Sequence, residues 1–233
     1  MENELHDIQK EILKGLLFRP TARFSDLNAR KLPSDQFTFH LKQLLAAKII
    51  EKEKQGGYQL TLRGKEYANR YDVDSGKPKL EKQAKLGVMV VALRNGGKST
   101  EVLMQRRLKQ PYYGFKGFVT GKIKWGELVA QTAARELEEE TGLNGQLEQK
   151  TILHEHILSA TGELLEDKYF FIFIAQKLKG TLIAKFPGGV NEWVAEKEIF
   201  RSRDIFYDIA DILKLIKTKN VGFLEKTYRV NRY

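Results

Sequence analysis

The chain has 233 residues, 42% of them hydrophobic, which is enough for one large domain or two ordinary ones. It contains no cysteine, which excludes disulfides and thiolate zinc sites and fits a reducing cytoplasm. Its net charge of +10 would attract a polyanionic ligand, or it serves solubility alone. The N-terminus is polar and no apolar run approaches the ~20 residues of a membrane span, so we expect a cytoplasmic protein.

Residues 1–72 carry the pattern of a small, mainly helical domain. Apolar residues at helical spacing predict a first helix from Ile8 to Leu17, which stops before Pro20. A glycine pair, Gly56-Gly57, predicts a hairpin between two short strands. The remaining expected elements are helices at 25–29, from 34 onward and from 62 to 71, and strands at 49–54 and 58–62.

Three segments carry a resemblance to a known DNA-binding fold: residues 37–44, 49–52 and 57–65. They are similar to the recognition helix, the wing and the following helix of winged helix-turn-helix regulators. The resemblance implies that the third helix enters the major groove of DNA. The residues it implies as contacts are Gln36, Thr38, His40, Lys42, Lys52 and Lys54. Two alternatives remain: the domain serves only to form a homodimer, and His40 only packs or caps.

Residues 73–84 are polar and predict an exposed linker before a second domain at 85–233. That domain opens with a buried strand over 86–93, a glycine turn and a returning strand over 101–107. A loop then carries Tyr112, Tyr113 and Phe115. These rings offer faces on which a nucleobase stacks, or they pack the loop against the sheet.

The most informative stretch runs from Gly121 to Leu143. A glycine loop leads into an amphipathic helix that ends at Gly142, a natural left-handed stop. Glu136, Glu139 and Glu140 stand at i, i+3 and i+4 and so share one helix face. Like charges at this spacing, near a helix C-terminus, destabilise the helix unless cations neutralise them. Three carboxylates on one face suit a hard divalent cation, Mg²⁺ above all.

The spacing in this stretch is Gly121, five residues, Glu127, seven residues, then Arg135-Glu136-Leu-x-Glu139-Glu140-x-Gly142-Leu. It resembles the box that defines the Nudix hydrolases. The resemblance implies an α+β fold in which a mixed sheet is sandwiched between helices. It also implies a Mg²⁺-dependent (or Mn²⁺-dependent) hydrolase that cleaves a nucleoside diphosphate linked to another group by attack of water on phosphorus.

The resemblance assigns roles within the box. Glu136, Glu139 and Glu140 are the implied metal ligands, joined by the carbonyl of Thr120, a position where many relatives have glycine. Glu139 is our first choice for the general base, Glu140 or a loop acid being the alternatives. Arg135 is expected to pair with Glu127 and hold the loop on the helix. Gly121 and Lys122 are expected to contact the substrate.

Beyond the box, the sequence predicts two long strands (147–159 and 166–176), a short strand at 191–194, a helix at 204–217 and a terminal strand or docking segment at 223–230. His154 and His156 lie two residues apart and so face one side of a strand. A metal pair and two surface histidines are both compatible with that spacing. Glu163, Glu166 and Asp167 are expected in a turn that reaches over the metal site.

Two functional hypotheses follow from these resemblances. The first is a nucleotide pyrophosphohydrolase with an accessory winged helix. The second is a transcription regulator whose Nudix domain senses a nucleotide without turnover. Every carboxylate of the box is present, which favours the enzyme.

Overall fold

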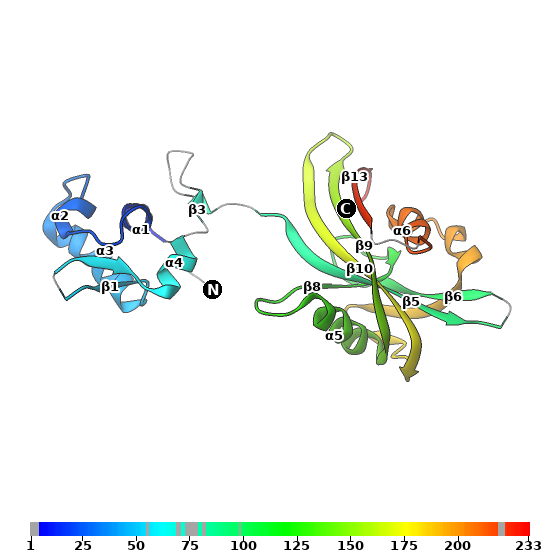
Figure 1. Ribbon diagram of the computed structural model, residues 1–233. Coiled ribbons are helices and arrows are strands. Elements are labelled where there is room, and N and C mark those ends of the chain that lie inside the picture. The colour runs from blue at the N-terminus through cyan, green and yellow to red at the C-terminus, as the bar shows by residue number, and fades with distance from the viewer. Residues whose placement is uncertain are drawn as a thin grey trace. The chain divides into compact units, whose positions relative to one another are not determined.

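The protein is described here by a computed structural model that covers residues 5–54, 56–68, 71–72, 79–80, 83–97, 99–218 and 222–233. The chain divides into two compact units, residues 1–82 and 83–233, and each has its own hydrophobic core. Figure 1 colours the first unit from blue to cyan and the second from cyan to red.

The first unit is built from short helices and a two-stranded sheet. Its elements are α1 (Asp7–Leu17), α2 (Phe24–Leu27), α3 (Ser34–Ala46), β1 (Ile50–Lys52), β2 (Tyr58–Leu60) and α4 (Leu62–Ala68). β1 and β2 pair antiparallel, as the hairpin pattern predicted. The core combines Ile12 and Leu13 of α1 with Phe37, Leu41 and Leu44 of α3, all of them almost completely buried. The apolar stripe of each helix thus faces the other elements of the unit.

Both strands of this unit are shorter than expected, and two helix boundaries also differ. The second helix begins at Phe24, because the Asp26 carboxylate accepts a hydrogen bond from the backbone N–H of Arg23 and makes Arg23 the N-cap. The last helix ends at Ala68, and β3 (Tyr71–Asp72) then pairs with β4 (Lys79–Leu80). Residues 73–78 and 81–82 of the expected linker lie outside the described residues.

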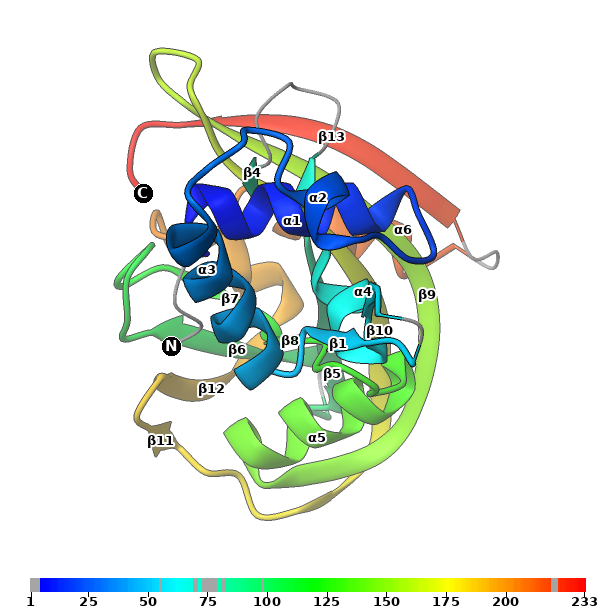
Figure 2. The ribbon, with the colours of Figure 1, turned by 90° about the vertical axis from the view of Figure 1, so that its left-hand side faces the viewer.

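The second unit is organised by a mixed sheet with the strand order β11-β12-β6-β5-β10-β9-β13. β10 runs parallel to β5 and β13 runs parallel to β9, whereas the other neighbours along this path are antiparallel. Two short strands, β7 and β8, pair with β6 and β5. Figure 2 shows β13 lying along β9 at the edge of this sheet. The strands are β5 (Lys85–Asn95), β6 (Thr100–Arg107), β7 (Lys116–Gly117), β8 (Val119–Lys122), β9 (Leu143–Ser159), β10 (Leu164–Gly180), β11 (Lys185–Phe186), β12 (Gly189–Ala195) and β13 (Gly222–Val230).

A separate core lies on each face of this sheet, because side chains alternate along a strand. Val88, Val90 and Ala92 of β5 pack with Ala133 and Leu137 of α5 (Val129–Thr141). Met89 and Val91 face the other way, toward a core formed with α6 (Ile209–Leu215) and the short 3₁₀ helix η1 (Glu196–Arg201). Helices therefore cover both faces of a mixed sheet, in the mixed α+β arrangement that the sequence predicted.

Three expectations about the later part of the chain were inaccurate. The final helix begins at Ile209 instead of Asp204, because Lys116 of β7 exchanges backbone hydrogen bonds with Asp204 and Phe206 and holds that segment extended. Glu166 and Asp167 lie within β10 and not in a turn. β9 and β10 are longer than expected, since both continue past their apolar runs into polar residues.

Candidate active site

The helix of glutamates, α5, is positioned by the turn that precedes it. Gly126 has φ +80°, a conformation that other residues rarely adopt, and the helix begins at Val129 after Leu128 as N-cap. Glu127 lies just before the helix, where its carboxylate accepts a hydrogen bond from the backbone N–H of Lys124 at 3.2 Å. Gly142 ends the helix with φ +70°. The backbone conformations of Gly126 and Gly142 thus help to set where α5 begins and ends.

Arg135 connects this loop to the helix. Its Nε lies 2.6 Å from Oε1 of Glu127 and its Nη2 lies 2.9 Å from Oε2, which makes a two-point ion pair. Hydrogen bonding from Arg135 lowers the pKa of Glu127 to about 2. The Nη1 atom of Arg135 also donates to Glu136 at 2.6 Å and to Glu139 at 3.1 Å. One guanidinium therefore offsets part of the charge that crowds this end of the helix.

The carboxylate of Glu136 lies directly against β8. A Cβ atom added to Gly121 would stand 1.9 Å from Cδ of Glu136, far inside contact distance. Only glycine at position 121 allows the strand and the glutamate to come this close. The side chain of Glu136 is only 12% exposed.

Glu140 is held from the other side, by β6 and β12. Gln105 donates to its carboxylate at 3.0 Å, and the Asn191 side chain donates to its backbone carbonyl at 2.7 Å. Burial raises the pKa of Glu140 above its ordinary value. Glu139, by contrast, has a side chain that is 57% exposed.

A pocket of about 660 Å³ opens beside these groups. Glu136, Glu140, Thr120, Gly121 and Lys122 all line it, so β8 and α5 together form one wall. Glu139 is not among the lining residues. The lining also includes a set of basic side chains: Lys85, Arg107, Lys109, Lys122, Lys124 and Lys168.

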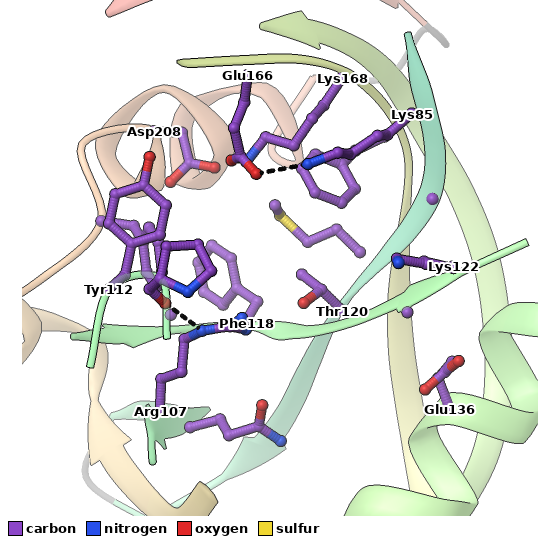
Figure 3. A pocket seen from close by; sticks show the side chains of 18 of the residues that line it. Lys85, Arg107, Tyr112, Phe118, Thr120, Lys122, Glu136, Glu166, Lys168 and Asp208 are labelled. Carbon is purple, nitrogen blue, oxygen red and sulfur yellow. Dashed lines mark hydrogen bonds and ion pairs between the residues drawn. The ribbon is translucent and has the colours of Figure 1, made fainter. Parts of the chain in front are cut away.

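The opposite end of the pocket holds a cluster of charges, of which Glu155, Glu166 and Lys168 are largely buried and Lys85 is exposed. The Nζ atom of Lys168 lies 2.8 Å from Oε1 of Glu155 and 2.8 Å from Oε2 of Glu166. The Nζ atom of Lys85 lies 2.9 Å from Oε1 of Glu166. Figure 3 shows Lys85, Glu166 and Lys168 pointing toward one another, with Glu136 across the pocket from them. Burial opposes the positive charge on Lys168, but Glu155 and Glu166 outweigh it and raise the pKa of the ammonium. Burial and the nearby Glu155 raise the pKa of Asp208 to about 7.

Several polar atoms near this end have no hydrogen-bond partner among the described residues. They are one carboxylate oxygen, Oε2, of Glu155 and the hydroxyls of Tyr112 and Tyr207, which lie near enough to each other to affect each other's pKa but do not meet hydrogen-bond geometry. Of these residues, Tyr112 and Glu155 line the pocket. Buried polar atoms are rarely left unpaired in a folded protein, so these atoms favour a polar ligand in this part of the pocket.

The aromatic loop does not place its three rings together. Tyr112 is 4% exposed and lines the pocket, whereas Tyr113 is 54% exposed and is absent from the lining. Phe115 is partly buried and packs against Tyr112 and Phe206. Of the three expected stacking residues, only Tyr112 therefore faces the pocket.

Sequence reasoning missed much of the far end of the pocket. It named Glu166, but in a turn and not in β10, and it did not name Glu155 of β9, Lys168 of β10 or Asp208 at the start of α6. The only sequence pattern that could have indicated these residues is a charged residue next to an apolar run, such as Lys168 immediately before the run Tyr169–Ala175. Gln105 and Asn191 gave no signal, because a single amide in a strand is common at surfaces.

The candidate DNA contacts lie in the first unit. Gln36, Lys42, Lys52 and Lys54 are exposed and Thr38 is half-buried. His40 is only 7% exposed, and its ring stacks on His6 with centroids 4.5 Å apart. The ring of His40 is therefore part of the packing between α3 and the start of α1, which agrees with the alternative that His40 packs.

Comparison with known proteins identifies the second unit. The sequence profile of the NUDIX domain matches residues 84–216, more than half of the chain. The chain belongs to the Nudix family. The matched residues include the Nudix box, which is carried mainly on β8, the loop after it and α5 (Figure 1). No curated protein sequence matches the chain.

Solved structures share the fold of this Nudix domain. A mutator MutT protein from Bacillus halodurans is 22% identical with a TM-score of 0.51, and the match covers 63% of this chain and 90% of that one. The NUDIX domain of Shewanella oneidensis NrtR, solved with ADP ribose, is 19% identical with a TM-score of 0.51, covering 64% and 94%. At these identities the likeness extends to the fold alone. Among the helices that the structure describes, none is both long and apolar enough to cross a membrane.

Proposed function

We propose that this protein is a Mg²⁺-dependent nucleotide pyrophosphohydrolase. One observation carries the proposal: carboxylates of the Nudix box, Glu136 and Glu140, line the same pocket as six lysine and arginine side chains. Cationic side chains attract and hold the phosphates of a nucleotide. Carboxylates next to them suit a divalent cation that bridges protein and phosphate.

The residues present fit such a cation. Glu136, Glu139 and Glu140 supply only oxygen donors, the kind that Mg²⁺ prefers, and Mn²⁺ accepts the same set. The hydrogen bonds to Arg135 and Gln105 engage one oxygen of each carboxylate, so the second oxygen remains for a cation. The backbone carbonyl of Thr120, beside the close approach of Gly121 to Glu136, is the further proposed ligand. When bound, Mg²⁺ would neutralise phosphate charge and lower the pKa of a water molecule.

The protein's own groups have distinct proposed roles. Lys122 is the last residue of β8 and Lys124 follows it, and we assign both to phosphate oxygens, together with Arg107 and Lys109 of the same pocket. Arg135 and Glu127 hold the loop on the helix and set the orientation of Glu136. A general base would take the proton of the attacking water as the bond to phosphorus forms. Glu139 is our first choice for that base. Glu140 or a loop acid is the alternative.

The remaining volume of the pocket accommodates the nucleoside. Tyr112, Phe118, Phe170 and Phe206 contribute aromatic surface to the lining, and a flat base packs well against such rings. A pocket of about 660 Å³ lies in the range of small-molecule sites. The unpaired hydroxyl of Tyr112 and the unpaired oxygen of Glu155 supply hydrogen-bonding groups for a base or a sugar.

The test is turnover of a substrate panel. Nucleoside triphosphates, ADP-ribose, other nucleotide sugars and dinucleotides would be incubated with the full-length protein and Mg²⁺, and the released phosphate or nucleotide measured. ADP-ribose belongs in the panel because the NrtR domain of similar fold was solved with that compound. Turnover that a Glu139→Gln variant lacks would support the proposal, and no turnover of any compound would count against it.

For residues 1–72 we propose a winged helix-turn-helix domain that binds DNA. Three helices followed by a two-stranded hairpin support this, as does the exposure of Gln36 and Lys42 on α3 and of Lys52 and Lys54 on or beside the hairpin. Thr38 and Gln36 would contact base edges, and the lysines would contact phosphates. The second candidate function is then a regulator in which the Nudix domain senses a nucleotide. Tight nucleotide binding without turnover would favour it.

The alternative role for residues 1–72 is to form a homodimer. Two results together would favour it: concentration-dependent association that disappears when these residues are deleted, and no retention of the full chain on DNA at low salt. Residues 73–84 are proposed as the linker in either case.

A further inference from the structure

A second cluster of metal-ligating side chains lies on strands β9 and β10, apart from the glutamates of α5. His154, His156 and Asp167 each offer one ligand atom, and these atoms all lie within 4.8 Å of one another. No other such group of histidines, cysteines or acids is found in the part of the chain that the structure describes. The strand register explains the cluster, because His156 pairs directly with Asp167 across β9 and β10.

This cluster does not belong to the substrate pocket. Side chains alternate along a strand, so His154 and His156 face one side of β9 while Glu155 between them faces the other. Glu155 lines the pocket, as do Glu166 and Lys168 on either side of Asp167. The histidine cluster therefore lies on the opposite face of the same two strands from the polar end of the pocket.

The ring of His154 is held in one orientation. It is 7% exposed and stacks on Tyr169 with centroids 3.9 Å apart and planes inclined by 6°. On the third strand, β13, Glu225 places its Oε2 2.6 Å from Nδ1 of His154. A carboxylate that accepts the Nδ1–H bond is the usual partner of a metal-binding histidine, because it directs the other ring nitrogen to the metal. That other nitrogen, Nε2, points to Asp167 at 2.9 Å.

We propose that His154, His156 and Asp167 form a binding site for a transition-metal ion, and that this ion is Zn²⁺. Two imidazole nitrogens and a carboxylate oxygen are a common donor set for zinc. Bonds of about 2.0–2.1 Å in a tetrahedron place neighbouring ligand atoms ~3.3 Å apart. Asp167 Oδ1 lies 2.9 Å from His154 Nε2, and Oδ2 lies 3.5 Å from His156 Nε2, so small side-chain rotations bring the donors to that spacing.

The surroundings of the cluster indicate how the ion would be coordinated and which strands it would join. The side chains of His156 and Asp167 are 38% and 36% exposed, which leaves a fourth position open to water. Zn²⁺ takes the place of the proton shared by His154 Nε2 and Asp167, and that proton is released to solvent. The ion would join β9 to β10, the strands that carry Glu155, Glu166 and Lys168 on their other face. Mg²⁺ prefers oxygen ligands and is not expected here.

The test is calorimetric titration of the full-length protein with Zn²⁺, with the visible absorption of bound Co²⁺ as a report of tetrahedral coordination. We expect His156→Ala and Asp167→Asn each to weaken Zn²⁺ binding at this site at least tenfold and to abolish the Co²⁺ absorption. Asp167→Asn keeps the size of the side chain, so a loss there does not reflect a collapsed strand pair. Circular dichroism would check that both variants are folded.

Two controls separate this site from others. His6→Ala removes an exposed histidine in the first unit, and Glu136→Gln removes a carboxylate of the Nudix box; both are expected to retain the Co²⁺ absorption and the Zn²⁺ affinity. Zn²⁺ should also raise the melting temperature of the wild type and not that of the Asp167→Asn variant. Equal Zn²⁺ affinity in Asp167→Asn and the wild type, or loss only in Glu136→Gln, would overturn the proposal. Absence of Zn²⁺ binding to the wild type would show that the cluster is an ion-pair network only.

Discussion

Arg135 and Glu127 form a two-point ion pair across the start of the Nudix box, with Nε–Oε1 and Nη2–Oε2 distances of 2.6 and 2.9 Å. The pair joins the loop after β8 to the middle of α5, and Arg135 also reaches Glu136 and Glu139. Glu127 does not line the pocket, so its effect on a bound substrate passes through Arg135.

We predict that Glu127→Gln lowers the catalytic efficiency about 10–100-fold, the usual cost of losing a group that orients metal ligands. The amide keeps the size of the side chain but loses the charge that pairs with Arg135. Steady-state kinetics at varied Mg²⁺ would measure this, and the Mg²⁺ concentration for half-maximal rate should rise. A variant with wild-type kinetics at every Mg²⁺ concentration would mean that the pair does not position the box.

Replacement of Gly121 by alanine should disturb the site directly. The added Cβ would stand 1.9 Å from Cδ of Glu136, so either β8 or the glutamate must move. We expect a loss of stability of about 1–3 kcal/mol, typical of overpacking, together with a large loss of activity. Denaturant unfolding and phosphate release would measure both effects.

Gly222→Ala is the control for that experiment. Its added Cβ would meet Thr151 Oγ1 at 3.6 Å, an ordinary contact, and we expect little change in stability or activity. If Gly121→Ala behaves like Gly222→Ala, then β8 and α5 do not approach one another as closely as described.

We predict that Asp208 makes the free energy of unfolding depend on pH. Burial and Glu155 raise its pKa from the ordinary 3.8 to about 7. Between these values the folded chain keeps a proton that the unfolded chain has lost, so this group lowers the free energy of unfolding as pH rises from about 4 to about 7. The slope is at most about 1.4 kcal/mol per pH unit.

The Asp208→Asn variant should lack that contribution. Its stability relative to the wild type should therefore increase as pH rises across this interval, which urea unfolding at a series of pH values would show. Parallel curves for the two proteins would mean that Asp208 titrates normally in the folded chain.

A Lys52→Ala/Lys54→Ala double variant tests the DNA-binding proposal. If both lysines contact phosphates, binding should weaken, and the slope of log K against log salt should become shallower by about 2. Fluorescence anisotropy with a duplex over a range of salt concentrations would measure it. Lys65→Ala, an exposed lysine on α4, is the control. An unchanged slope in the double variant would exclude the hairpin as a DNA contact.

The sequence predicted most of the framework but only one side of the pocket. Spacing rules identified the box because Gly121, Arg135 and the glutamates lie within one loop and one helix, where local geometry fixes their relation. The far end of the pocket depends on sheet register: Lys168 meets Glu155 only because β10 pairs antiparallel with β9. The extended segment before α6 depends likewise on β7, from which Lys116 bonds to Asp204 and Phe206. Periodicity within a single segment does not contain such long-range pairings.

The most direct test of the central proposal is turnover by Glu136→Gln and Glu138→Gln compared with the wild type. Both variants remove one negative charge from α5, but Glu136 lines the pocket, whereas Glu138 is exposed and lies outside the lining. With the best substrate of the panel and saturating Mg²⁺, we predict that Glu136→Gln loses at least about a hundredfold in rate and that Glu138→Gln keeps nearly the wild-type rate. Equal rates in the two variants, or no turnover by the wild type, would contradict the assignment of this pocket as a pyrophosphohydrolase site.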